Sequence, residues 1–184
     1  YYYEFFPSNK LELGLWLESE RMLHPVIDEI GVETQNEVVK EEKRLSYDNR
    51  PYGQLLPQIT QSLFKKHPYR WLPIGSMDHL DSATLDEFIA YNKKFYVPNN
   101  AVLVVAGNFE IDETKNKIND YFGPIPRGKD VPRIDVEEDP LTAEVKKSFY
   151  DPNIQLPMGL VCYRIPSFKE RDSYVLDMIS SILS

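Results

Sequence analysis

Residues 123–140 form a stretch that neither a helix nor a central strand can cross. The segment, GPIPRGKDVPRIDVEEDP, contains four prolines and two glycines and shows no hydrophobic periodicity. Proline lacks the backbone N–H that helices and sheets use, so each proline ends or displaces such an element. We therefore predict a linker at 123–140, which separates a larger piece, residues 1–122, from a smaller one, residues 141–184.

The two pieces contain strand-like and helix-like stretches in an irregular order. Short aromatic or β-branched runs are typical of strands, and such runs lie at 1–6, 99–107, 142–150 and 156–164. Helical signals predict helices at 10–23, 33–47, 54–66, 84–95, 111–122 and from residue 168 onward. The order is not a regular strand–helix–strand alternation, so we predict an α+β fold.

Local signals place some of the boundaries. Thr84 and Glu87 match a capping box, which predicts a helix start at this point. Pro25 and Gly31 predict breaks before the helix at 33–47. Residues 67–81 are rich in turn formers and are predicted to be a loop.

The composition excludes several classes of protein. The formal net charge of −8 argues against a nucleic-acid partner, because phosphate binding needs a basic face. Cys162 is the only cysteine, which excludes an internal disulfide and a thiolate metal cage. No membrane span is expected, since no run of 18 apolar residues occurs. The opening YYYEFF predicts a strand already under way and the closing MISSILS an unfinished helix, so we expect an excised piece of a longer protein.

One glutamate lies where the helix at 33–47 should be apolar. On a helical wheel with Val38 at zero, Val39 lies at about 100° and Leu45 at about −20°. Glu42 lies at about 40°, inside this apolar stripe, and Gln35 lies at about 60°, two turns earlier. An ionised carboxylate on a buried face is costly unless a cation or hydrogen-bond donors meet it. Glu42 is therefore predicted to need a partner from outside this segment.

Two readings of Glu42 follow from the residues alone. Helical glutamates are usually solvated or paired with an arginine or lysine of another element, and a metal ion is the less common partner. By the same wheel, Glu41 lies at about −60° and Glu37 at about −100°, toward solvent.

The segments VETQNEVVKEEKRLSYDNRPYG (32–53) and HPYRWLPIGSMDHLDSATLDEFIAYNKKFYVPNNAVLVVAGNFE (67–110) closely resemble the pitrilysin-type zinc peptidases. This group carries an inverted HxxEH motif and includes mitochondrial processing peptidase and many bacterial zinc proteases. The resemblance covers nearly the whole chain. It implies two similar α+β repeats, each with helices packed on a mainly antiparallel sheet. Residues 1–122 would then complete the catalytic repeat, and residues 141–184 would begin the non-catalytic one.

The resemblance also implies a zinc site and a role for Glu42. In active relatives the two histidines of HxxEH bind zinc, and its glutamate is the general base. The third ligand is the last glutamate of the pattern E-R-x-x-V-x-x-E, where Val39 and Glu42 occupy the matching positions here. Two imidazoles and one carboxylate leave a fourth position for a water. We therefore predict one zinc ion in the intact protein and none held by this chain alone.

This chain departs from the family pattern in two ways. It has no HxxEH, so no catalytic residue is expected in it, and the general base is expected upstream. His24, His67 and His79 have no second histidine at helical spacing and are predicted to be surface or turn residues. Gln35 stands where the pattern often has a glutamate. It is predicted to lie behind the zinc ligand without binding the ion, and its neutral amide would lower the local negative charge.

The resemblance leaves two functions open. The first is a zinc endopeptidase that cleaves peptides or unfolded protein segments in a chamber completed by a second peptidase-like repeat or subunit. The second is a non-catalytic relative that serves as a scaffold or chamber wall. A helical interaction module without peptidase ancestry is a more distant alternative. The resemblance fits a bacterial periplasmic, cell-envelope or cytoplasmic protein and leaves the compartment open.

Overall fold

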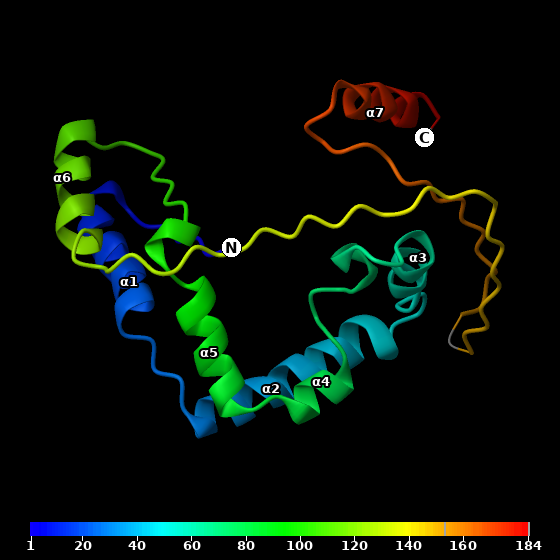
Figure 1. Cartoon of the computed structure of the whole chain (residues 1–184), viewed down its shortest axis with the longest axis horizontal. Coiled ribbons are helices and arrows are strands. Elements are labelled where there is room, and N and C mark those ends of the chain that lie inside the picture. The colour runs from blue at the N-terminus through cyan, green and yellow to red at the C-terminus, as the bar shows by residue number, and fades with distance from the viewer. Residues whose placement is uncertain (153, 184) are drawn as a thin grey trace. The chain divides into compact units, whose positions relative to one another are not determined.

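Helices provide the regular structure of the chain, which a computed structural model describes at residues 1–152 and 154–183 (Figure 1). The chain divides into two units: residues 1–38 with 77–134, and residues 39–76 with 135–184. The first unit contains α1 (Leu11–Leu23), most of α2 (Glu29–Lys43), α4 (Met77–Ser82), α5 (Leu85–Phe95) and α6 (Ile111–Phe122), with 3-10 turns η1 (Ser8–Lys10) and η4 (Pro98–Asn100). The second contains the end of α2, the π-helical turn η2 (Arg44–Asp48), α3 (Leu55–Leu63), the 3-10 turn η3 (Pro68–Arg70) and α7 (Arg171–Leu183).

The first unit is built on the contact between α1 and α6 (Figure 1). Leu15 of α1 and Thr114 of α6 are buried. At the edge of this contact, the Tyr121 hydroxyl donates to a Glu12 carboxylate oxygen at 3.0 Å, and the Lys117 ammonium lies 3.5 Å from the other Glu12 oxygen. The two helices thus cover Leu15 and Thr114 where they meet, and such packing stabilises helices that would be marginal alone.

Helix α5 begins where the sequence predicts. The Thr84 hydroxyl accepts from the Glu87 amide at 3.4 Å, and the Glu87 carboxylate accepts from the Thr84 amide at 2.9 Å. Both halves of the capping box are therefore present and satisfy two amides that the helix leaves free. The predicted helix at 111–122 is also confirmed, with the same bounds.

Three local predictions need correction. Gly31 does not break the chain, because α2 already begins at Glu29 and the Asp28 carboxylate accepts from the Gly31 amide at 2.7 Å. A satisfied amide in the first turn compensates for the poor helix propensity of glycine. The helix predicted at 54–66 ends earlier, at Leu63. The loop predicted at 67–81 contains η3 and the start of α4.

The predicted α+β fold with an antiparallel sheet is wrong for this structure. The part of the chain that is described contains helices and no β-strand. The runs 99–107, 142–150 and 156–164 include extended chain without a paired neighbour, and Val102 is 91% exposed. A strand needs a partner to satisfy its backbone groups, and an apolar alternating run cannot specify that partner.

The N-terminal run 1–6 packs on a helix and does not join a sheet. The Phe6 ring lies so close to Gly14 of α1 that a Cβ there would be 2.3 Å from it. The Tyr2 hydroxyl lies 2.6 Å from the Tyr96 hydroxyl, which ties the segment to the end of α5. None of the helices in the described ranges has the length and apolarity of a membrane span.

Candidate functional site

Glu42 lies in the last turn of α2 and is exposed to solvent. The apolar stripe of this helix is also exposed at two positions, Val38 by 54% and Leu45 by 64%. The predicted burial of Glu42 on that stripe is therefore not observed. The Glu42 carboxylate forms no hydrogen bond and no ion pair with any other residue that the structure describes. The helix therefore presents an open carboxylate between apolar neighbours, and its assignment as a metal ligand stays a prediction.

The neighbouring glutamates differ from Glu42 in having partners. Glu41 accepts from the Arg44 guanidinium at 3.1 Å, which is an ion pair one turn along the helix. Glu37 also takes part in an interaction within the described chain. Among these three carboxylates, Glu42 is the one left available to a cation. Gln35 is exposed on α2, and its supporting role also stays a prediction.

Each of the three histidines has a partner in the structure, and for His24 and His67 that partner is local. His24 forms a 2.7 Å contact with the Glu20 carboxylate at the end of α1. The His67 ring accepts from the Tyr69 amide at 3.1 Å and so caps η3. His79, in α4, also has an interaction partner in the structure. Within the described residues, no group of three or more histidine, cysteine or acidic side chains is arranged to hold a metal ion.

Glu138 is a residue that sequence reasoning missed. It lies in the linker, yet its carboxylate accepts hydrogen bonds from three consecutive amides of the turn after α3. The bond from the His67 amide, with those from Lys65 and Lys66 and the charge of Arg164, lowers the pKa of Glu138 to about 2. The acidic run 137–139 and the basic run 65–67 carry opposite charges, but nothing in the sequence indicates that they meet.

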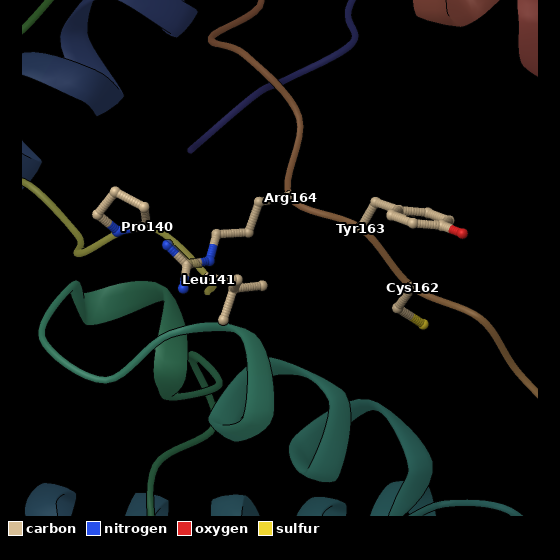
Figure 2. Close-up of a pocket in the computed structure, with 5 residues that line it drawn as sticks. All are labelled: Pro140, Leu141, Cys162, Tyr163 and Arg164. Carbon is tan, nitrogen blue, oxygen red and sulfur yellow. The ribbon is translucent and has the colours of Figure 1, made fainter. Parts of the chain in front are cut away.

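A shallow pocket lies beside the linker end (Figure 2). It has a volume of about 320 Å³ and is lined by Pro140, Leu141, Cys162, Tyr163 and Arg164. Figure 2 shows the Arg164 side chain reaching toward Pro140 and Leu141, while the Tyr163 ring points the other way. Cys162 is a free, exposed thiol, and no histidine lines the pocket to act as its base.

Comparisons with known proteins agree on one family. Residues 82–184 match the family described as "Peptidase M16 inactive domain". The zinc protease PqqE of Helicobacter pylori is 32% identical over 93% of this chain, and the uncharacterized zinc protease YmfH of Bacillus subtilis is 24% identical over 74%. The chain spans 38% of the length of PqqE and 31% of that of YmfH.

A solved structure is also similar. It is the crystal structure of a protease from Helicobacter pylori, which matches with a TM-score of 0.68 and 28% identity. The match covers 72% of this chain and 32% of that chain.

Proposed function

Because the chain belongs to the peptidase M16 family, we propose that it is the part of a zinc metalloendopeptidase that supplies the third zinc ligand, Glu42. The family membership confirms the resemblance on which the sequence prediction rests. The proposed substrates are peptides or unfolded protein segments. Names of relatives such as zinc protease PqqE support the reaction class, and the ligand role is our own assignment.

What supports this proposal is the position of Glu42, which matches the last glutamate of the family pattern in a chain that is 32% identical, over 93% of its length, to a zinc protease. Carboxylate oxygen is one of the donor types that zinc accepts, and an unpaired, exposed group can ligate without first losing another partner. The described residues contain no group of three metal-binding side chains, so they fit one ligand position and not a whole site. We therefore expect the isolated chain to bind zinc weakly and to be inactive.

The proposal gives each part of the chain a task. Glu42 would hold one position of a bound zinc ion, which would supply polarisation of the scissile carbonyl and a lowered pKa of a bound water. Glu42 holds one ligand position from the end of α2, and the neutral amide of Gln35 avoids a second negative charge on that helix. We also propose that residues 1–122 complete the catalytic repeat, that residues 123–140 link the repeats, and that residues 141–184 begin the non-catalytic one.

The test compares two adjacent glutamates in the whole protein. Glu42→Gln keeps the size of the side chain and removes its charge, and Glu41→Gln is the matched control on the same helix. We expect Glu42→Gln to lose stoichiometric zinc and at least about a hundredfold in kcat/KM toward an unfolded protein substrate. The control should keep both within about twofold, since an exposed ion pair contributes little.

Zinc content is measured by elemental mass spectrometry and folding by circular dichroism. Full zinc and full activity in a folded Glu42→Gln protein would refute the ligand assignment. A parent protein that lacks zinc and activity in its wild-type form would favour the second candidate, a non-catalytic subunit that forms a scaffold or chamber wall. The description of the matching family as an inactive domain is the observation that favours this candidate.

A further inference from the structure

The turn that follows α3 binds the end of the linker, and the Glu138 carboxylate accepts three of its backbone amides. The Glu138 oxygens accept from the amides of Lys65 at 2.7 Å, Lys66 at 2.8 Å and His67 at 2.7 Å. From this geometry we propose that Glu138 is a latch, which docks in an anion-binding turn at residues 65–67 and sets the point from which the chain continues after residue 140.

The three amides are available because they lie beyond the helix. The last backbone hydrogen bond at the end of α3 runs from the Phe64 amide to the Thr60 carbonyl, so the next amides have no helical acceptor. Consecutive amides that point to one side of a turn form a concave site for an anion. A carboxylate that accepts three such bonds is strongly favoured in its charged form.

The turn keeps its shape through contacts that do not involve Glu138. The Arg70 guanidinium donates to the Lys65 carbonyl at 2.8 Å, and the Tyr69 amide donates to the His67 ring at 3.1 Å. The rings of His67 and Tyr69 have centroids 4.4 Å apart, and the Phe64 ring packs edge-on against Tyr69 at 5.6 Å. The site is therefore preorganised, and releasing Glu138 would leave an empty turn with the same form.

A third segment joins at the same place. The Arg164 guanidinium donates to the Asp139 carbonyl at 2.6 Å, and it lies over the Phe64 ring with its central carbon 5.8 Å from the centroid. The Lys66 ammonium adds a 2.7 Å ion pair with the Asp139 carboxylate. The latch thus brings together the turn after α3, the linker end and the chain near residue 164, all within one unit.

Hydrogen–deuterium exchange of the whole protein, resolved to single amides, tests the latch. We expect Glu138→Ala to speed exchange at residues 65–67 by about tenfold, because three amides lose their acceptor. Glu138→Gln should give a smaller increase, since an amide oxygen still accepts but carries no charge. Glu137→Ala is the matched control, because the Glu137 carboxylate makes no hydrogen bond to the described residues, and its rates should stay within about twofold.

Helix α6, in the other unit, serves as the internal reference for global opening. Unchanged rates at residues 65–67 in Glu138→Ala would overturn the proposal, and so would an equal acceleration in α6. If Glu138→Ala does not fold, Glu138→Gln decides by the same two criteria. The readout does not depend on zinc or on peptidase activity, so it succeeds or fails separately from the assignment of Glu42.

Discussion

The two ends of the linker are attached by different kinds of contact. Near its start, the Gly128 amide donates to the Asn99 side chain at 2.9 Å, and the Asn99 amide group donates to the Lys129 carbonyl at 3.3 Å. Gly128 also lies against the buried side chain of Val97. Near its end, the charged carboxylate of Glu138 accepts from three backbone amides, and Asp139 adds contacts to Lys66 and Arg164. The first end depends on close packing and on the hydrogen bonds of the neutral Asn99 side chain, one of which goes to the Asp130 carboxylate at 3.4 Å. At the second end, by contrast, a charged carboxylate meets backbone amides.

This difference predicts that the start of the linker is sensitive to added volume. A Cβ on Gly128 would lie 2.3 Å from Val97 Cγ1 and 2.7 Å from Val97 Cβ. Because Cβ is fixed to the backbone, a rotation of the Val97 side chain cannot relieve this clash. We expect Gly128→Val to lower the free energy of unfolding by about 1–3 kcal/mol, measured by urea denaturation. Gly159→Val is the control, since nothing lies within 4 Å of a Cβ there, and it should change stability by less than about 0.5 kcal/mol. Equal effects of the two changes would contradict the packing argument.

The end of the linker should respond to pH in a defined window. Hydrogen bonds from backbone amides, with that of His67 the strongest cause, hold the pKa of Glu138 at about 2, against an ordinary value of 4.5. A lowered pKa contributes stability that is present above 4.5 and is lost as the pH falls toward 2. Three other charged groups lie near Glu138: Lys66, Arg164 and Asp139. Their effects on the pH dependence of stability must be separated from the effect of Glu138.

Comparison with Glu138→Gln makes that separation. The stability difference between wild type and Glu138→Gln, measured by urea denaturation from pH 6 to pH 2.5, should be largest at pH 6 and shrink below pH 4.5. A difference that stays constant over this range would show that charge on Glu138 is not what holds the linker end.

The smallest effect is expected at a side chain that lies in the latch but does not form it. Lys66 binds Glu138 through its backbone amide, and its ammonium pairs with Asp139 where both groups are largely exposed. Lys66→Ala keeps the amide, so exchange at residues 65–67 should stay within about twofold of wild type. If exchange accelerated as much as in Glu138→Ala, the Lys66 side chain, and not the backbone amides, would be what holds the linker end.

Local signals in the sequence predict the helices well. The pair Thr84 and Glu87 predicts the start of α5, because a capping box involves only residues three positions apart. The end of α6 at Phe122 coincides with the start of the glycine- and proline-rich linker. Gly31 shows the limit of this reasoning, since the Asp28 side chain satisfies the amide of a residue that propensity alone would treat as a break.

The candidate site also has features that the sequence predicts and features that only the structure shows. Periodicity and family pattern single out Glu42 among three nearby glutamates, and the structure adds that Glu41 is paired while Glu42 is open. The predicted burial of the stripe around Glu42 is not seen, because burial depends on what packs against a helix and not on the helix itself. Glu138 escapes sequence analysis for the same reason, since its three partners lie more than seventy positions earlier in the chain.

The sequence by itself determined the peptidase family, the helices whose ends carry capping or breaking residues, and the irregular course of the linker. Those features depend on residues close together in the chain, or on motifs that occur in a set order. The tertiary structure alone decided that the apolar runs stay unpaired in the described chain, that Glu42 is open, and that Glu138 meets the turn at residues 65–67. Each of these depends on which distant groups come within hydrogen-bonding or packing distance, and local sequence carries no record of that choice.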